Sequence, residues 1–587
     1  MDDKRNLILA GVLTLIIMIG WPYISARFFP APPTPPAQSA PAAAPQATAS
    51  GGSAAPNAID ATAAIKPLSA VLPGSPRVAI DTPRLKGSIN LKGARIDDIL
   101  LPDYKQSIDK GSPSVRLLSP AGTKDAYFAG FGWSGTGLKG PDANTVWTPD
   151  RATLTPATPV TLSWDNGAGQ SFKIKLSVDK DYMLTVAQTV ENMGAAPIAV
   201  RPYGYVSRTL DTQPEKSGTL HIGPMGVFNG AANYDVSYAS LAGQSSGFFN
   251  SLFGRSTDPG PAHFSSTGGW LGFTDKYWHA ALIPAQNLAF SAEFRNAGGE
   301  RYQADMSYNQ SKVAPGKALT VTSRLFAGAK ETKLLEGYTS QGVALFDRAI
   351  DWGWFRWFEK PIFYLLDWLF NTIGNFGIAL ICLTLIVRGA MFPVAQRQFQ
   401  SMAAMRAIQP KMKALQEKHK DDKLKSQQAI AELYKSEKVN PLSGCLPLFL
   451  QIPIFFALYK VLSLTIEMRQ QPFFLWIHDL SAPDPLHVLN LFGLLPFTPP
   501  GFLAIGPLAI LLGITMFLQF KLNPAPMDEM QKQMFQIMPW MMMFIMGSFA
   551  SGLLLYWCTS NLLTILQQWW LYRQHPALTQ AAPARAN

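Results

Sequence analysis

The sequence predicts an α-helical membrane protein that carries a large all-β domain, and three observations indicate this fold class. The chain has 587 residues, which is too long for one ordinary soluble domain. Charged residues make up only 15% of it and hydrophobic residues 48%, whereas a typical soluble protein has about 25% charged residues. Short alternating runs fill the first half, and long apolar runs fill the second. We therefore expect a soluble part joined to a membrane part.

The N-terminal segment, residues 1–29, has an apolar run from Leu7 to Trp21 that follows basic residues. Such a run is either a cleaved signal peptide or an uncleaved anchor. It ends in Trp-Pro-Tyr, which suits the membrane interface, so we favour a transmembrane anchor with its N-terminus in the cytoplasm. Residues 30–76 are rich in Pro, Ala and Ser and cannot bury enough apolar surface to fold, which predicts a disordered linker.

Residues 77–335 are predicted to form the all-β domain. Gly, Asp, Asn and Pro punctuate short runs in which apolar and polar residues alternate. In "SFKIKLSVDKDYMLTV", for example, Phe172, Ile174 and Leu176 fall on one face of a strand. Period-two alternation with frequent turns indicates antiparallel strands, and the length favours a large β-sandwich over a small barrel.

Residues 336–370 turn helical and aromatic. The stretch "DWGWFRWFEKPIFYLLDWLF" places Arg356, Glu359 and Lys360 among aromatic rings. This amphipathic pattern predicts linking helices that lie in the membrane interface. The alternative is a helix that packs on the core of the β domain.

The next part, residues 371–572, is predicted to contain five transmembrane helices. They are expected at about 371–394, 441–463, 502–522, 534–546 and 551–571. The last two share one long apolar stretch, which divides near "GSFASG". Together with the anchor, the chain is expected to have six transmembrane helices.

The distribution of charge predicts how these helices are oriented. Residues 388–438 carry 11 Lys and Arg against 5 Asp and Glu, whereas residues 464–501 carry Arg469 against three acidic residues. By the positive-inside rule, the basic segment is cytoplasmic and the acidic loop is external. The protein then lies in the inner membrane of a Gram-negative bacterium, with the β domain in the periplasm. The tail, 573–587, lies in the cytoplasm. Residues 395–438 are expected to form a cytoplasmic helical hairpin, whose basic faces could contact ribosomal RNA, anionic lipid or only water.

The sequence offers no convincing motif for catalysis, metal binding or a cofactor. GxxxxGK[ST] does not occur, so nothing suggests ATP-driven transport, and the zinc-protease motif HExxH does not occur either. "GQSSG" at 243–247 fits the GxSxG nucleophile pattern, but it lies in a Ser- and Gly-rich loop, so Ser245 is not expected to be catalytic. Cys382, Cys445 and Cys558 lie in separate apolar runs and suggest neither a disulfide framework nor a zinc site. We predict no catalytic residue, no metal site and no cofactor, and therefore no enzyme.

Arg388 interrupts the apolar stretch "NFGIALICLTLIVRGAMFPVAQ". A charge at mid-membrane costs about 2.5–3.5 kcal/mol on insertion scales. One interpretation is that Arg388 marks the cytoplasmic end of its helix by snorkelling. The other is that it lies within the membrane, solvated by polar side chains such as Thr384 or Gln451. No Asp or Glu occurs in the five core spans, so a counter-charge would come from outside, for example from an acidic segment of an incoming polypeptide.

The stretch "FQIMPWMMMFIM" concentrates methionines in one short predicted span. Methionine is flexible and polarizable, and it suits surfaces that accept many apolar shapes. Met538, Met542 and Ile545 are therefore candidates for a hydrophobic slide that contacts an apolar polypeptide segment. Simple packing against lipid is the alternative.

Six stretches distributed along the chain match a known family. They are "MDDKRNL" (1–7), "LKGARIDDILLPDY" (91–104), "VRGAMFPVAQRQFQSMAAMRAIQPKM" (387–412), "NPLSGCLPLFLQIPIFFALYKVL" (440–462), "PFFLWIHDLSAPDP" (472–485) and "SGLLLYWCTSNLLTILQQ" (551–568). On these residues the chain resembles the YidC family of bacterial membrane protein insertases, which is related to the mitochondrial oxidase-assembly and thylakoid insertases. The likeness covers nearly the whole chain apart from the linker.

The resemblance implies an insertase and chaperone that moves transmembrane segments sideways into the bilayer, alone or with the Sec translocon. It implies a hydrophilic, positively charged groove formed by the five core helices and closed to the periplasm. The groove positions that it implies are Arg388, Thr384, Phe392, Gln451, Phe455, Tyr556 and Trp557. The periplasmic domain would be a β-supersandwich similar to that of sugar mutarotases, without sugar chemistry.

The same resemblance implies a set of partners. These are nascent membrane proteins as substrates, the Sec translocon and membrane lipids, with the ribosome and the signal recognition particle receptor as further candidates. DNA is not expected. A small-solute transporter or channel is the alternative class, although the spans lack paired charges, and an anchored periplasmic carbohydrate-binding or scaffolding protein is a third.

The sequence departs from the family's pattern in several places. Trp557 stands where a second Tyr is expected, and Ala550 replaces an expected Pro. Residues 487–501 add an apolar stretch to the second external loop. The tail is short and hardly basic, which weakens the case for ribosome binding through it.

Overall fold

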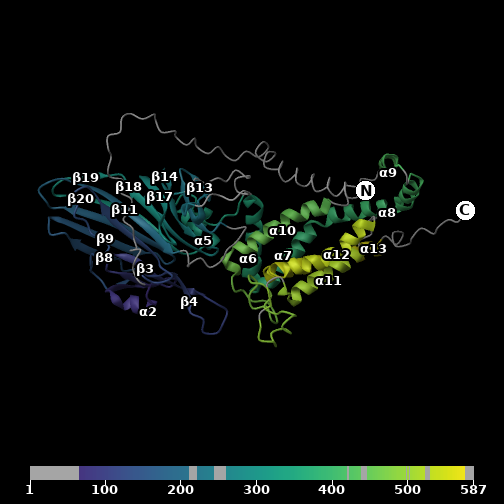
Figure 1. Ribbon diagram of the computed structural model, residues 1–587, viewed down its shortest axis with the longest axis horizontal. Helices are drawn as coiled ribbons and strands as arrows, with labels where there is room; N and C mark the ends of the chain where they lie inside the picture. The colour runs from purple at the N-terminus through teal and green to yellow at the C-terminus, as the bar shows by residue number, and fades with distance from the viewer. Residues whose placement is uncertain are drawn as a thin grey trace.

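The computed structural model describes residues 65–209, 221–243, 260–353, 355–419, 422–437, 446–497, 499–500, 503–522 and 529–574. The predicted anchor, the motif around Ser245 and most of the predicted tail lie outside these ranges. The strands form a body at one end of the molecule, and the helices extend from it toward the other end (Figure 1).

Two mainly antiparallel sheets build the all-β domain. The first, of 11 strands, has the order β14-β17-β18-β11-β5-β3-β2-β1-β7, with β19 on β11 and β4 on β3. Its strands are β1 (Arg77–Asp81), β2 (Lys86–Asn90), β3 (Arg95–Lys105), β4 (Ser114–Leu118), β5 (Tyr127–Ser134), β7 (Thr153–Leu154), β11 (Ile198–Thr209), β14 (Ala262–Thr267), β17 (Ala289–Gly298), β18 (Arg301–Tyr308) and β19 (Ser311–Val313). The second, of 9 strands, has the order β13-β12-β15-β16-β20-β10-β9-β8-β6. Its strands are β6 (Thr148–Pro149), β8 (Val160–Asp165), β9 (Gln170–Val178), β10 (Met183–Asn192), β12 (Gly223–Phe228), β13 (Ala231–Asn233), β15 (Gly269–Thr274), β16 (Trp278–Ile283) and β20 (Lys317–Ala329).

The alternation in the sequence decides which face of a strand is buried. In β9, Phe172, Ile174 and Leu176 are at most 2% exposed, whereas Lys175 between them is exposed. β9 pairs antiparallel with β8 and β10, as the period predicts. Rings from the two sheets meet in the core, where Trp133 of β5 lies 5.2 Å from Phe172 between ring centroids. The predicted large β-sandwich is confirmed.

The end of the predicted disordered linker is ordered. Residues 65–76 include the short helix α2 (Leu68–Val71) and a 3-10 turn, η1 (Leu72–Gly74). Prolines at the starts of these turns fix φ near the helical value. The backbone N–H of Lys66 donates to the carbonyl of Gly122 at 2.8 Å, which ties the segment to the β domain. The prediction of disorder is therefore wrong for these residues.

Three helices of different lengths lead from the sandwich to the helical part. They are α5 (Thr332–Ser340), η3 (Phe346–Ala349) and α6 (Arg356–Ile373), and a further short helix, α3 (Tyr238–Leu241), lies within the β domain. Leu335 and Tyr338 of α5 are buried, so α5 packs on the core of the β domain. α6 is amphipathic instead, and it exposes Trp357 and Trp368. Its place in a membrane interface stays a prediction.

The helical part follows. Its elements are α7 (Phe376–Ala390), α8 (Phe392–Lys418), α9 (Lys423–Ser436), α10 (Leu446–Leu464), η5 (Ile466–Met468), α11 (Pro507–Leu522), α12 (Glu529–Met546) and α13 (Ser551–Gln574). α13 packs against α7, α10 and α11, and α12 packs against α11. α8 and α9 pack against each other where the hairpin is predicted, and Lys411 pairs with Glu437 at 2.6 Å between them.

The predicted span 371–394 is not one helix. α6 extends into it and is closed by Gly374, which adopts the left-handed region at φ +79°. Asn375 then caps α7, since its side chain accepts a hydrogen bond from the N–H of Ile378 at 3.0 Å. Residue 391 separates α7 from α8. The other four predicted spans correspond to α10, α11, α12 and α13.

Among the described residues, no helix is by itself both long enough and apolar enough to cross a membrane. The six transmembrane helices stay a prediction.

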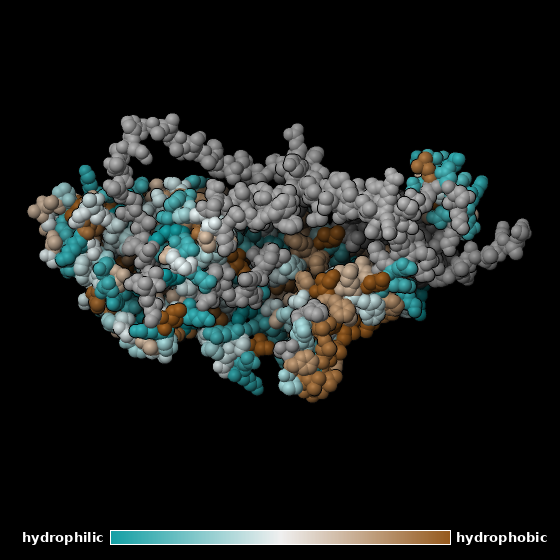
Figure 2. All heavy atoms as spheres, viewed as in Figure 1, coloured by the Kyte–Doolittle hydropathy of each residue, from teal (hydrophilic) through white to brown (hydrophobic). Residues whose placement is uncertain are grey.

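Hydrophobic residues are exposed over the helical part and over the loop between α10 and α11, whereas the β domain is largely hydrophilic (Figure 2). Leu491, Phe492 and Leu494 of this loop are all more than half exposed. They belong to the apolar addition noted in the sequence.

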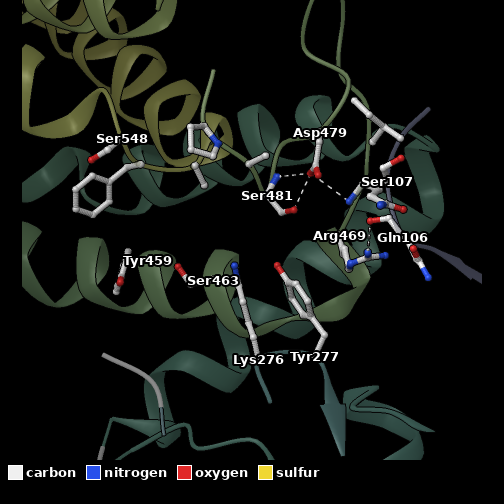
Figure 3. Close-up of a pocket in the computed structure, with 16 residues that line it drawn as sticks. Gln106, Ser107, Lys276, Tyr277, Tyr459, Ser463, Arg469, Asp479, Ser481 and Ser548 are labelled. Carbon is white, nitrogen blue, oxygen red and sulfur yellow. Dashed lines mark hydrogen bonds between the residues drawn. The ribbon is translucent and has the colours of Figure 1, made fainter. Parts of the chain in front are cut away.

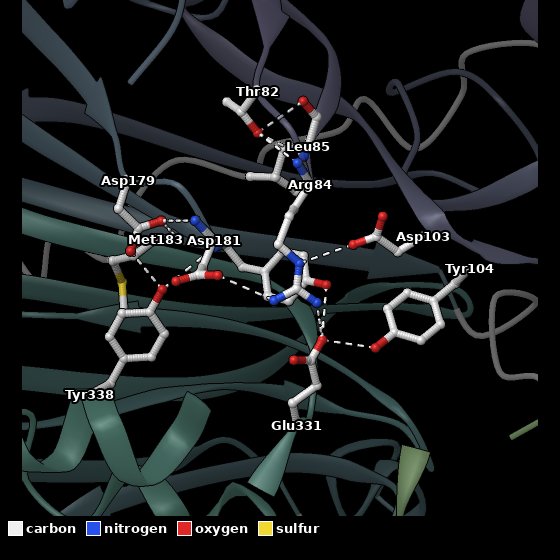
Figure 4. Close-up of polar contacts among 11 residues, drawn as sticks. Thr82, Arg84, Leu85, Asp103, Tyr104, Asp179, Asp181, Met183, Glu331 and Tyr338 are labelled. Carbon is white, nitrogen blue, oxygen red and sulfur yellow. Dashed lines mark hydrogen bonds and ion pairs between the residues drawn. The ribbon is translucent and has the colours of Figure 1, made fainter. Parts of the chain in front are cut away.

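A network of charged and hydroxyl groups holds the start of α5 against the sandwich (Figure 4). Arg84 donates to Asp103 at 3.0 Å and to Asp181 at 3.2 Å, and it also pairs with Glu331. The hydroxyl of Tyr104 donates to the same Glu331 at 2.8 Å. Three carboxylates thus surround Arg84, and one of them, Glu331, directly precedes the first residue of α5.

The loop after α10 joins the helical part to the β domain. Glu467 accepts a hydrogen bond from the backbone N–H of Thr332 at 3.0 Å, and Arg469 donates to the carbonyl of Lys105 at 2.7 Å. Burial raises the pKa of the Glu467 carboxyl to about 7, while backbone hydrogen bonds act in the opposite direction. Polar contacts therefore fix how the β domain sits on the helices.

Candidate functional site

Arg388 lies near the C-terminal end of α7, where α7 packs against α13. Its Nε donates to Oγ of Ser560 in α13 at 3.0 Å, and its Nη2 donates to the same hydroxyl. None of the ion pairs formed within the described part of the chain includes Arg388. The guanidinium is thus held by a neutral partner rather than by a carboxylate.

Gln451 of α10 and Tyr556 of α13 form the second polar contact of this cluster. Nε2 of Gln451 donates to the hydroxyl of Tyr556 at 2.9 Å, and Tyr556 is only 2% exposed. Tyr556 and Ser560 are four residues apart, so they lie on the same face of α13. Three helices, α7, α10 and α13, therefore bring Arg388, Ser560, Tyr556 and Gln451 into one polar cluster, in which Tyr556 and Ser560 are buried and Arg388 and Gln451 are half-buried.

An aromatic pair lies one turn further along α10. The rings of Phe455 and Trp557 are 5.0 Å apart between centroids, and both side chains are partly buried. A second pair, Tyr459 with Phe549, follows at 6.1 Å. The tryptophan that departs from the family's pattern thus still makes an aromatic contact across the two helices.

Two of the predicted groove residues lie elsewhere in this arrangement. Thr384 is fully buried, and its hydroxyl donates to the carbonyl of Leu380 in its own helix at 2.7 Å. Ser560, not Thr384, is therefore the polar partner of Arg388. Phe392, at the start of α8, has Trp570 as its aromatic neighbour at 5.7 Å.

The residues of the predicted slide in α12 differ in exposure. Ile545 is 48% exposed, whereas Met538 and Met542 are half-buried. The exposed stripe of α12 consists of Ile537, Trp540, Met541, Phe544 and Ile545. Residues three and four positions apart on a helix share a face, so this stripe forms one continuous apolar surface.

Ser560 was not predicted from the sequence. Its spacing of four from Tyr556 within "YWCTSN" was the signal that could have revealed it. Lys460, which lies within a predicted span, was also overlooked. It is 6% exposed, and its Nζ donates to the carbonyl of Asp351 at 3.0 Å, at the junction with the β domain.

No group of His, Cys, Asp and Glu in the described ranges could hold a metal ion. The fold and the site together define a helical protein that carries a large β-sandwich. Its helices have an apolar surface, and the positively charged side chain of Arg388 lies among them.

Comparison with known proteins identifies the family. Residues 77–365 match the model of the YidC periplasmic domain, and residues 368–578 match that of the 60Kd inner membrane protein. The chain is 43% identical to the membrane protein insertase YidC of Zymomonas mobilis subsp. mobilis, over 98% of this chain and 96% of that protein. The chain therefore belongs to the YidC family of membrane protein insertases, and its β-sandwich is the periplasmic domain of an inner-membrane protein.

Solved structures show weaker likenesses. One match is the crystal structure of an active YidC insertase with the first transmembrane domain resolved. The match covers 84% of this chain and 92% of the solved chain, at 17% identity and a TM-score of 0.34. A galactose mutarotase related enzyme from Lactobacillus acidophilus covers 43% of this chain and 97% of its own, at 10% identity and a TM-score of 0.29.

Proposed function

We propose that this insertase works through the cluster of Arg388, Ser560, Tyr556 and Gln451. The cluster accepts the hydrophilic external segment of a nascent membrane protein, while the apolar segment of the substrate moves along the exposed helix surfaces. Membrane insertion is the function of the family, and the residues that perform it in this chain are the proposal.

The observation that carries the proposal is the neutral partner of Arg388. An arginine has five N–H donors. In Arg388, two nitrogen atoms, Nε and Nη2, contact Ser560. A hydroxyl satisfies hydrogen bonds without cancelling the charge. The guanidinium can therefore still attract a carboxylate or a backbone carbonyl of a substrate, and charge-assisted hydrogen bonds of this kind are about twice as strong as neutral ones.

The driving force comes from the substrate and needs no nucleotide. Burial of apolar surface is favourable by about 25 cal/mol per Å², and a transmembrane segment has about 20 apolar residues. The membrane potential adds about 2.3 kcal/mol per charge per 100 mV for a negative charge that moves outward. The exposed stripe of α12, which includes Ile545, provides an apolar surface for this segment, with Met538 and Met542 beside it.

The topology is part of the same proposal. Six transmembrane helices with cytoplasmic termini agree with the charge of the loops, because the basic segment 388–438 would face the cytoplasm. The proposed partners are nascent membrane proteins and the Sec translocon. The ribosome and the signal recognition particle receptor would meet the cytoplasmic hairpin of α8 and α9, and lipids would surround the helices.

The test is insertion of a single-span substrate with an acidic external segment into proteoliposomes that contain Arg388→Ala or Arg388→Lys. We expect Arg388→Ala to slow insertion at least about tenfold, which corresponds to about 1.4 kcal/mol, and Arg388→Lys to retain much of the rate. Arg573→Ala is a matched control, since it removes an arginine near the end of the same helix that carries Ser560. Equal rates for Arg388→Ala and the unchanged protein would refute the role of the charge.

A further inference from the structure

A cavity of about 920 Å³ lies between the β domain and the helical part (Figure 3). The helical part contributes Tyr459 and Ser463 of α10, and Ser548 lies opposite them in the bend between α12 and α13. Lys276 and Tyr277 approach from the side of the β domain. The cavity therefore lies at the periplasmic end of the helices.

One face of α10 connects this cavity with the polar cluster. Gln451, Phe455, Tyr459 and Ser463 follow one another at intervals of four residues, so they lie along one side of the helix. Gln451 belongs to the cluster, and Ser463 lines the cavity. The two are about 18 Å apart along the helix, since 12 residues rise by about 1.5 Å each.

Two aromatic pairs lie between these ends. Phe455 contacts Trp557 at 5.0 Å, and Tyr459 contacts Phe549 at 6.1 Å between ring centroids. Both pairs bridge from α10 to α13 or to the residues just before it. Tyr459 and Phe549 also line the cavity, so the second pair is the boundary between the cavity and the interior of the bundle.

The chemistry of the cavity is that of a hydrophilic site. Lys276 and Arg469 supply two cations, against the single carboxylate of Asp479. Oδ1 of Asp479 already accepts hydrogen bonds from the backbone and side chain of Ser481 at 2.8 and 2.7 Å, and from the backbone N–H of Gln470 at 3.1 Å. Arg469 in turn donates to the carbonyl of Lys105 at 2.7 Å, a neutral partner, and hydroxyl groups of Ser463 and Ser548 add neutral hydrogen-bonding capacity.

We propose that this cavity binds the hydrophilic external segment of the substrate after that segment has passed the two aromatic pairs. The inference rests on the proposed function, and it adds a second binding site on the periplasmic side. A cavity lined by two cationic side chains, one carboxylate and several hydroxyl groups suits a polar polypeptide segment that carries acidic residues. The β domain takes part because Lys276 and Tyr277 form one wall.

The test places a photoactivatable amino acid at Ser463 or Ser548 in the full chain, and separately at Gln451. Ser265 in β14 is the control, because it is exposed on the β domain and does not line the cavity. The probe is a single-span protein with an acidic external segment, stalled at increasing lengths of that segment in proteoliposomes. A single symmetric peak in size-exclusion chromatography of each detergent-solubilised variant, with a proteolysis pattern like that of the unchanged protein, shows that each variant is folded.

We expect adducts from Gln451 first, and adducts from Ser463 and Ser548 once the external segment is longer by about six residues, because an extended chain spans about 3.3 Å per residue. Adducts from Ser463 and Ser548 no stronger than those from Ser265, together with adducts from Gln451, would overturn the cavity site and leave the proposed function standing. Adducts of these positions with lipid alone would also overturn it. Loss of adducts from Gln451 as well would overturn the proposed function itself.

Discussion

The β domain and the helical part hold their arginines in different ways. In the β domain, Arg84 contacts three carboxylates, and the buried Arg208 pairs with Asp275 at 2.8 Å. In the helical part, Arg388 contacts the hydroxyl of Ser560. The same side chain is therefore neutralised by fixed carboxylates in one region and held by a neutral group in the other.

This difference separates charges that stabilise the fold from a charge that remains able to act. Removal of one partner from a buried ion pair strongly destabilises the folded state, because the other charge then stays buried without compensation. Such pairs fix the β domain but leave no net positive charge for a ligand. Arg388 has a hydrogen-bonding partner and keeps its charge, which is what attraction of a passing acidic segment requires.

The largest expected effect comes from breaking a pair in the β domain. Asp275→Asn leaves the guanidinium of Arg208, whose side chain is 1% exposed, without its carboxylate. We expect the free energy of unfolding to fall by about 3–5 kcal/mol. Pulse proteolysis of the detergent-solubilised chain across a urea series measures this loss.

The control for this prediction is the exposed pair of Lys86 and Asp81, whose side chains are 49% and 58% exposed. Asp81→Asn is expected to change stability by less than about 1 kcal/mol, because exposed pairs contribute little. Similar losses for Asp275→Asn and Asp81→Asn would contradict a structural role for the buried pair.

The next effect concerns the junction between the two regions. Burial raises the pKa of Glu467 from 4.5 to about 7. A carboxyl with a higher pKa in the folded state stabilises that state fully below its unfolded pKa of about 4.5, and this contribution is lost as the pH rises through about 7. The junction should therefore weaken between pH 5 and pH 8 by up to about 3 kcal/mol, at about 1.4 kcal/mol per pKa unit.

Hydrogen exchange of the Thr332 amide measures this weakening directly, because that N–H donates to Glu467 at 3.0 Å. Glu467→Gln has no titrating carboxyl there, so it is expected to flatten the pH dependence of protection. Comparison of the two proteins at each pH removes the intrinsic effect of pH on exchange. An equal pH dependence in both would show that Glu467 does not control the junction.

A smaller effect is expected when Arg388 receives the kind of partner that Arg84 has. Ser560→Asp places a carboxylate next to the guanidinium and should neutralise it. We expect insertion of a substrate with an acidic external segment to slow about tenfold, or about 1.4 kcal/mol, while a substrate with an uncharged segment is less affected. Proteoliposome insertion rates for the two substrates provide the measurement, with Ser560→Asn as a neutral control of similar size. Equal slowing by Asp and Asn would mean that size rather than charge matters.

The two regions also differ in how far the sequence predicted them. Alternation in β9 predicted both the strand and its buried face, because burial of Phe172 and Ile174 depends on local period. In the helical part, the apolar run around residues 371–394 concealed a helix boundary. Gly374 is an ordinary signal for the end of a helix, and Asn375 is one for the start of the next. The apolar run around them nevertheless favoured a single span.

The candidate site was only partly predictable for a different reason. Arg388 stands out because it is a charge in an apolar run, but its partner Ser560 lies 172 residues away in the chain. No periodicity relates positions on two separate helices, so their contact depends on how α7 and α13 pack. The same limitation explains why Thr384, a near neighbour in sequence, was expected to solvate Arg388.

The smallest expected effect tests that last correction. Thr384→Ala removes a hydroxyl that donates to the carbonyl of Leu380 at 2.7 Å, within its own helix. The carbonyl keeps its place in the helix, so we expect stability to change by at most about 1–1.5 kcal/mol, as for an ordinary intramolecular hydrogen bond.

The ratio of insertion rates for acidic and uncharged substrates should stay within about twofold of the ratio for the unchanged protein. A tenfold change in this ratio would correspond to about 1.4 kcal/mol. Ser560→Ala, which removes the hydroxyl that Arg388 contacts, should change this ratio more. If Thr384→Ala changed the ratio and Ser560→Ala did not, the partner of the acting charge would be Thr384, and the contrast between the two regions would need a different basis.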